Sequence, residues 1–331
     1  MGAQGLSSRA IIGAFFDRLT SMAAQSWIPL VSMHFLSNQI SEVYKFLGMA
    51  PAVRPWEGPR MTKGLREDGV TIINELYETS IEVDPREARR DKSGQIMVRV
   101  NELASRMLTH WGKLLSDLIN NGAAAVGYDG QYFFDTDHVT DLSGTQDNDL
   151  SIDISALPTA VHGSTTAPSP EESAACIFQA IAAILGFKDD QGEPMNEDAE
   201  SFLVMTGANP QYQAAIEAVS AANLSGGRTN SLAANFNVSA VMNARITATE
   251  GLYVFRTDGE VKPFIRQSER QDGTGGGEIA AATDSTSDVR LDAVAEGSEM
   301  EARENKWLFG ASSDRAVGYG YWQHACLVTM T

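Results

Sequence analysis

The sequence contains few cysteines and no long hydrophobic run. Cys176 and Cys326 are the only two cysteines among 331 residues, the first in an apolar helical pattern and the second in an apolar strand pattern. We interpret both as buried free thiols, because a disulfide framework or metal motif needs more cysteines, and this usage fits folding in a reducing compartment. The longest nearly apolar run, residues 177–187, is about half as long as a bilayer-spanning helix. The early apolar stretch ends at Asp17 without a cleavage site, so we predict no secretory signal.

Basic residues are also scarce. Twenty-five Lys and Arg oppose 43 Asp and Glu, which gives a formal net charge of −18. A surface this acidic repels phosphate, so binding of nucleic acid through general electrostatics is disfavoured. Acidity could serve solubility, or it could keep packed DNA from adhering to the wall of a container; charge alone does not separate the two. The length and the hydrophobic fraction of 43% indicate a folded chain with one large domain or two to three smaller ones.

Signatures of catalysis are missing as well. The densest carboxylate group surrounds one histidine: Asp129, Asp135, Asp137, His138 and Asp141. These residues could hold a divalent cation, but the glycine-centred calcium loop is absent, and we interpret the stretch as an acidic surface loop. The acidic run 188–198 is interpreted as a solvated turn, and no phosphate-loop lysine follows the glycines at 275–277. Because no nucleophile lies in an elbow pattern, we predict no catalytic residue, no cofactor and no metal ligand.

Residues 51–66 form a basic stretch in this acidic chain. Three prolines and two glycines exclude a regular helix there. A solvated loop would not need such a contrast in charge, so we predict that it reaches onto an acidic neighbouring chain. Its candidate contact residues are Arg54, Trp56, Arg60, Lys63 and Arg66.

Residues 77–84 alternate strictly between apolar and polar side chains, which predicts a strand. Apolar residues and a turn-like Asn-Glu pair within residues 70–75 predict that this strand is part of a hairpin. Glu78 and Glu82 lie on the polar face and are further candidate contacts with another subunit. A polar-faced hairpin with a basic approach indicates a projecting arm rather than a core element.

Two of the predicted helices lie in the first half of the chain. Residues 7–22 form an amphipathic pattern, and the apolar face with Phe15 and Leu19 needs a partner, either the chain's own core or a neighbouring subunit. Residues 95–121 predict a helix about 40 Å long. Its apolar side chains recur at steps of three and four: Ile96, Val100, Leu103, Met107, Trp111, Leu114 and Leu118.

The second half mixes helices and strands. Ser169 and Pro170 begin a helix that ends near Gly186, and a further helix runs from 209 to 219. Residues 202–205 and 308–330 read as strands, and the pair at 258–259 predicts a hairpin between 253–255 and 261–265. Residues 271–290 predict a flexible surface excursion. Together these elements predict an α+β fold.

Five segments along the chain carry a recognisable set of motifs: KGLREDG to LINNG (63–122), YDGQYFFDTDH (128–138), FKDDQGEPMN (187–196), VFRTDGEVKPFIRQ (254–267) and AVGYGYWQHACLVTMT (316–331). In this order they resemble the major head subunit family of Mu-like phages and prophages, which is similar in fold to the Hong Kong 97-type tailed-phage capsid protein. The resemblance covers nearly the whole chain and is weakest at 271–290.

The resemblance implies a division of the chain. Residues 1–50 would be an N-terminal arm and 51–84 the extended loop that lies across an adjacent subunit. Residues 85–151 would be the peripheral domain with the spine helix at 95–121. Residues 152–300 would be the axial domain, with 271–290 as an insertion. Residues 301–331 would be strands that complete the sheets.

The function implied by the resemblance is self-assembly. The chain would form the hexamers and pentamers of an icosahedral virion shell in the host cytoplasm, around double-stranded DNA that it encloses without reading its sequence. A scaffold, a protease, a portal and a decoration protein would be its other partners. Two alternatives stay open: a nanocompartment shell of the same fold that loads enzymes, and an acidic metal-binding enzyme with its site at 129–141, whose activity would be lost on Asp137→Ala.

Overall fold

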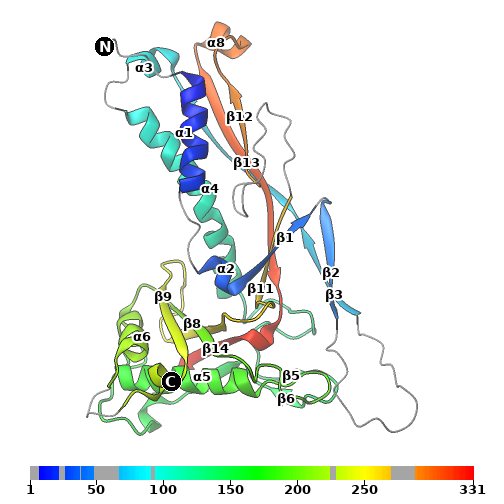
Figure 1. Ribbon diagram of the computed structural model, residues 1–331, viewed down its shortest axis with the longest axis vertical. Coiled ribbons are helices and arrows are strands. Elements are labelled where there is room, and N and C mark those ends of the chain that lie inside the picture. The colour runs from blue at the N-terminus through cyan, green and yellow to red at the C-terminus, as the bar shows by residue number, and fades with distance from the viewer. Residues whose placement is uncertain are drawn as a thin grey trace.

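The computed structural model describes residues 7–21, 27–37, 39–47, 67–90, 94–223, 229–269 and 288–331. Two five-stranded sheets, each with its own helices, form an elongated upper part and a broader lower part (Figure 1). The α+β fold predicted from the sequence is therefore confirmed. In the described part of the chain, no helix has both the length and the hydropathy to cross a membrane.

The first sheet has the order β1-β11-β13-β12. The fifth strand, β4, pairs with residues 307–315 of β13, on the edge opposite β12. The strands of this sheet are β1 (Ser32–Ser37), β4 (Glu75–Val83), β11 (Phe264–Glu269), β12 (Arg290–Val294) and β13 (Trp307–Tyr319). Three short helices accompany it: α2 (Ile28–Val31), α3 (Pro85–Arg90) and α8 (Glu299–Glu304). The first part of β13 alternates between buried and half-buried positions, and the strand pairs with β4, β11 and β12, so it forms the centre of the sheet.

Helix α4 (Gln95–Asn120) lies along this sheet, and α1 (Ser8–Ser21) packs against α4 (Figure 1). The 26 residues of α4 span about 39 Å, which agrees with the helix of about 40 Å predicted at 95–121. The N-terminal half buries Val100, Leu103 and Met107 in a core shared with Trp307 and Phe309. The C-terminal half contributes to a second core, so α4 connects the two parts of the molecule.

The second sheet has the order β7-β14-β10-β8-β9. Its strands are β7 (Asp149–Ile152), β8 (Ser201–Thr206), β9 (Asn237–Met242), β10 (Gly251–Arg256) and β14 (Ala325–Met330). The helices of this part are α5 (Pro170–Gly186), α6 (Pro210–Ser220), α7 (Ser231–Asn235), η1 (Ile154–Ala156) and η3 (Trp322–His324), and β5 (His138–Val139) pairs with β6 (Thr145–Gln146). The predicted cap of α5 is confirmed, because Ser169 Oγ accepts from the Glu172 backbone N–H while the Glu172 carboxylate accepts from the Ser169 N–H.

Both hairpins predicted from the sequence are wrong in their pairing. The strand at 75–83 is present, but β4 pairs with β13, and residues 67–73 form β3 (Glu67–Ile73), which pairs with β2 (Ser41–Leu47). Only Asn74 separates β3 from β4, which is too little chain for a turn between paired strands. The strand therefore belongs to the first sheet, and the projecting hairpin is β2–β3.

The turn at 258–259 connects two sheets rather than two paired strands. Gly259 has a positive φ of 78°, as the turn signal implied, but β10 lies between β14 and β8 while β11 lies between β1 and β13. The turn is held by the Arg256 side chain, whose Nε donates to Asp258 Oδ1 at 2.6 Å. Each strand thus finds two partners distant in sequence instead of one local partner.

Candidate assembly surfaces

The β2–β3 hairpin is fixed to the body of the molecule through one face. Ile72 is buried against Ile265 and Ala316 of the first sheet, and Tyr44 packs beside them. Burial, with the neighbouring Glu42 carboxylate, raises the pKa of Tyr44 to about 12. The hairpin root is therefore anchored by apolar contacts, while Figure 1 shows the hairpin standing out at the side of the molecule away from α4 and α5.

The opposite face of the hairpin root exposes large apolar side chains. Val43 and Ile73 point away from the anchored residues. Ile40, which precedes β2, is 78% exposed, and Leu76, the second residue of β4, is 68% exposed. We call this group of exposed apolar residues the hairpin patch: Ile40, Val43, Ile73 and Leu76. Single exposed apolar residues are ordinary, but a group at the root of one projecting element indicates a surface that another protein covers.

The basic residues predicted to make subunit contacts lie beyond β2. Arg54, Trp56, Arg60, Lys63 and Arg66 fall within 48–66, between β2 and β3, and outside the described residues. Their contacts with another subunit stay a prediction. What the structure adds is that the chain enters and leaves this segment through the paired strands of the hairpin.

Glu78 and Glu82 lie on the exposed face of β4, as the alternation predicted. Glu82 forms an ion pair with Lys306 at 3.0 Å, so its charge is partly matched within the chain. The Glu78 carboxylate accepts a hydrogen bond from Ser80 Oγ at 2.9 Å. Glu78 is therefore the freer of the two acidic candidates for contact with another subunit.

The structure corrects the prediction that Phe15 and Leu19 are candidate contacts with another subunit. Both side chains are buried inside the chain, 0% and 1% exposed, in the core that α1 forms with α4. The apolar face of the first helix thus finds its partner in the chain's own core, which is one of the two possibilities that the sequence left open. A neighbouring subunit is not needed to cover it.

The acidic loop around His138 is held by its own hydrogen bonds. His138 is fully buried, its Nδ1 lies 2.7 Å from Asp129 Oδ2, and its Nε2 lies 3.2 Å from Asn148 Oδ1. The ring stacks on Trp322 with centroids 3.9 Å apart. Both ring nitrogens of His138 thus lie within hydrogen-bond distance of a partner, and the stacking on Trp322 holds the loop against η3. Within the described ranges, no group of three or more His, Cys, Asp or Glu is placed to hold a metal ion.

Other buried titratable groups serve the cores. Cys176 and Cys326 are free and buried, as predicted, and burial beside Glu172 raises the pKa of Cys176 to about 12. Such thiols are poor nucleophiles. Burial, with the nearby Arg256 and Lys262, lowers the pKa of His324 to about 4. These residues therefore stay neutral around pH 7.

The arrangement of a spine helix, two sheets and a projecting hairpin is the fold of tailed-phage capsid subunits. The subunit in the procapsid of bacteriophage JBD30 superposes with a TM-score of 0.52 at 18% identity, over 98% of this chain and 77% of that chain. The virus-like particle from Pyrococcus furiosus superposes with a TM-score of 0.50 at 11% identity, over 97% of this chain and 98% of that chain. At such identities, the likeness establishes the fold alone.

Sequence comparison gives a narrower relationship. Residues 9–156 match the family described as Mu-like prophage major head subunit gpT. The Mu-like prophage FluMu major head subunit of Haemophilus influenzae is 28% identical over 117 residues, which are 35% of this chain and 38% of that protein. The major capsid protein of Escherichia phage Mu is 26% identical over 108 residues, 33% of this chain and 35% of that protein. The resemblance predicted from the sequence is thus confirmed over residues 9–156, whereas the prediction extended it to nearly the whole chain. The matches to the two relatives span little more than a third of the relatives' length.

The matched range contains the elements that carry the candidate surfaces. It begins in α1 and ends in η1, and it includes the β2–β3 hairpin, β4 and the spine helix. Residues 157–331 lie outside this range, and there the fold likeness to capsid subunits continues.

Proposed function

We propose that this chain is the major capsid subunit of a tailed phage or prophage, which builds an icosahedral shell of hexamers and pentamers around double-stranded DNA. The hairpin patch is the observation that carries the proposal, because a projecting apolar surface is what a self-assembling subunit needs and a monomer does not. The family match over the same elements and the capsid fold support it. Function then lies in contacts between subunits, without a catalytic step.

Mutual burial is the proposed mechanism. Covering one exposed Val, Leu or Ile side chain is worth about 1.5–3 kcal/mol, so the four residues of the hairpin patch contribute several kcal/mol toward an interface. Much of this offsets the loss of rotational and translational freedom on association. Many such weak contacts per subunit, repeated by symmetry, give a stable shell from marginal pairs.

The basic segment adds electrostatic specificity to this contact. Arg60, Lys63 and Arg66 would meet carboxylates of another subunit, in a chain whose net charge is −18. Reversing the three charges to Glu should stop assembly and leave the monomer folded, which sedimentation and circular dichroism check together. Normal shells from this variant would remove the electrostatic part of the proposal.

The domain division can be redrawn on the two sheets. The peripheral domain would hold the first sheet with α1, α3 and α4, and the axial domain the second sheet with α5 and α6. The extended loop would begin at β2, near residue 41, rather than at 51, and would end with β3. β11 and β12 would be peripheral, although they fall within the range 152–300 that the resemblance assigned to the axial domain, and so would α8, which begins at the end of that range. In a virion the partners would be copies of the chain, with a scaffold, protease, portal and decoration protein during assembly in the host cytoplasm.

A nanocompartment shell is the second candidate. The likeness to the virus-like particle from Pyrococcus furiosus supports it, since the fold does not separate the two kinds of shell. The match to the Mu-like head subunit family favours the phage capsid. The contents of the shell distinguish the two candidates, because a phage capsid packages DNA and a nanocompartment packages protein.

Electron microscopy of the purified full chain tests the proposal. We expect megadalton shells, and we expect Ile40→Asp with Leu76→Asp to abolish them, because two charges would enter a buried contact. Leu142→Asp is the matched control, since Leu142 is 74% exposed in the turn between β5 and β6 and belongs to neither β2–β3 nor β4. A small particle from the unmodified chain would overturn the proposal, and equal loss of shells in the control would remove the hairpin patch from it.

A further inference from the structure

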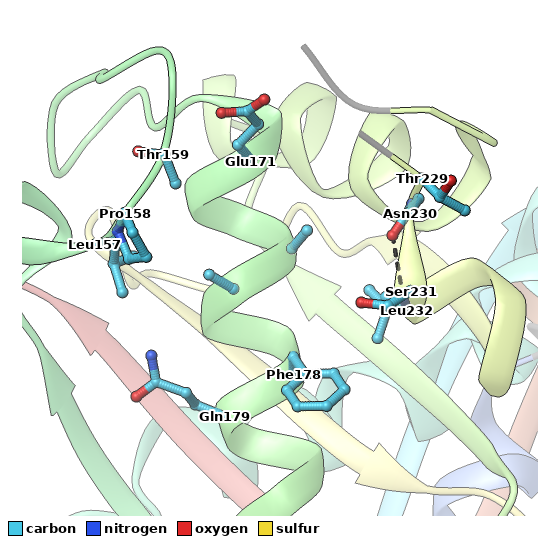
Figure 2. A pocket seen from close by; sticks show the side chains of 12 residues that line it. Leu157, Pro158, Thr159, Glu171, Phe178, Gln179, Thr229, Asn230, Ser231 and Leu232 are labelled. Atoms are coloured by element: carbon cyan, nitrogen blue, oxygen red, sulfur yellow. Dashed lines mark hydrogen bonds between the residues drawn. The ribbon is translucent and has the colours of Figure 1, made fainter. Parts of the chain in front are cut away.

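A pocket in the lower part of the molecule lies over one face of α5. It has a volume of about 370 Å³, and its walls are α5, the loop after η1 and the segment that leads into α7 (Figure 2). Helix α5 contributes a row of lining residues: Glu171, Ala174, Ala175 and Phe178. Their spacing of i, i+3, i+4 and i+7 places them on one helix face. The two alanines leave a trough between a carboxylate and a ring that are roughly 10 Å apart along the helix.

Glu171 is the unusual group in this pocket. It is only 5% exposed, and its Oε2 accepts a hydrogen bond from the Ala160 backbone N–H at 2.6 Å. Its Oε1 is buried and has no hydrogen-bond partner among the described residues. A carboxylate offers about four acceptor sites, and a buried one with a single partner is costly. Its place in the first turn of α5 favours negative charge, but it does not supply the missing donor.

The other walls indicate which donor fits. Leu157, Pro158 and Leu232 supply apolar surface at the sides, beside the neutral polar groups of Thr159, Gln179, Thr229 and Ser231, and the half-exposed ring of Phe178 closes the far end. Asn230 is not available to Glu171, since its Nδ2 donates to Ala218 O at 2.6 Å while its Oδ1 accepts from the Leu232 N–H (the dashed line in Figure 2). A divalent metal ion fits poorly, because the pocket presents one carboxylate, and its other oxygen groups are neutral hydroxyls and amides.

We propose that this pocket binds an ammonium or guanidinium group carried on a short aliphatic stem. The cation donates to Glu171 Oε1, the stem lies along Ala174 and Ala175, and the ring of Phe178 contacts its end. This chemistry has two sources, a free organic amine or the Lys or Arg side chain of a second copy of the chain. The site goes beyond the proposed shell function, which does not require it.

The probe for the test is n-butylguanidinium, with uncharged 1-pentanol as the matched probe. Saturation-transfer NMR measures the binding of each to the full chain in its assembled and unassembled forms. We expect the cation to bind at least tenfold more tightly than the alcohol, and Glu171→Gln to weaken the cation at least tenfold. Glu217→Gln on the exposed face of α6 is the control and should leave binding unchanged. If Glu171→Gln does not fold, Ala175→Leu fills the trough, keeps the carboxylate and should give the same loss.

The two forms of the chain distinguish the sources. Binding to both forms indicates a free amine, whereas binding to the unassembled chain alone indicates that a second copy fills the pocket in the shell. The proposal is overturned if the alcohol binds as well as the cation, or if Glu171→Gln and Ala175→Leu leave the affinity unchanged. It is also overturned if binding appears only after Arg228→Ala, because the chain's own arginine next to the lining residue Thr229 would then be the occupant.

Discussion

The buried ion pair between Arg315 and Asp288 offers a sharp test of how the first sheet is held to the spine helix. Arg315 in β13 is fully buried, and its Nε donates to Asp288 Oδ2 at 2.5 Å. Its Nη1 donates to the backbone carbonyl of Met107 in α4 at 2.7 Å, and the guanidinium lies 4.8 Å from the centroid of the Trp111 ring. Asp288, which precedes β12, is 2% exposed.

Asp288→Ala would leave the guanidinium charge buried with a carbonyl and a ring as its partners. Breaking a buried pair from one side costs about 3–5 kcal/mol, because the remaining charge is uncompensated. With an unfolding entropy of about 2.1 cal/mol/K per residue, a chain of this length should lose roughly 4–7 °C in melting temperature. Urea unfolding of the unassembled full chain, followed by circular dichroism, measures the free energy directly.

The exposed pair of Arg290 and Asp292 is the matched control. These side chains are 46% and 55% exposed, so Asp292→Ala should cost less than about 1 kcal/mol. The double variant Arg315→Met with Asp288→Leu should recover most of the stability lost in Asp288→Ala, since apolar residues of similar size often replace a buried pair at little cost. A loss for Asp288→Ala no larger than that for Asp292→Ala, or no recovery in the double variant, would refute this reasoning.

Two further predictions concern the other buried and close-packed groups. Because burial lowers the pKa of His324 from 6.5 to about 4, the unfolded chain takes up its proton first, so stability should fall between about pH 6.5 and 4 as pH decreases. His324→Gln should flatten this part of the dependence of the urea midpoint on pH, and an unchanged slope would contradict the assignment. A Cβ at Gly320 would lie 2.8 Å from the backbone oxygen of Lys262, so Gly320→Ala should destabilise the chain by about 1–3 kcal/mol in urea unfolding. Gly13→Ala on the exposed side of α1 meets nothing within 4 Å and should stabilise by about 0.5–1 kcal/mol; equal signs for the two glycines would contradict this account.

The spine helix shows how far periodicity predicts burial. The predicted row of apolar residues on α4 agrees with the structure over the first half of the helix, where Val100, Leu103 and Met107 are buried. In the second half, the structure buries Leu115 and Ile119 more deeply than the predicted Leu114 and Leu118. The reason is that α4 passes from the first core to the second, where Trp111, Leu115 and Ile119 are the residues that it buries. A regular pattern in sequence does not reveal that one helix serves two cores.

Strand pairing is the part of the fold that the sequence predicts least well. The alternation at 77–84 and the turn at 258–259 were both real, but local signals favour the nearest strand as partner. The actual pairs, β4 with β13 and β10 with β14, join segments that are far apart in sequence. Register and partner depend on which apolar faces meet in three dimensions, which no single segment encodes. For the same reason the exposed side of the hairpin root and the unpartnered oxygen of Glu171 became visible only in the structure.

The junction between the two parts of the molecule connects these observations. Among the described residues, α4, the turn between β10 and β11, and the chain from β13 through η3 into β14 all cross it. Trp111 lies there with the guanidinium groups of Arg315 and Arg266 at 4.8 and 5.4 Å from its ring centroid. An apolar junction of the same size could slide, whereas directed hydrogen bonds of a guanidinium fix one orientation. In the proposed shell, a subunit that presents its hairpin and its lower part to different neighbours would need such a fixed angle. The hydrogen bonds of Arg315 at the spine helix provide it from inside the chain.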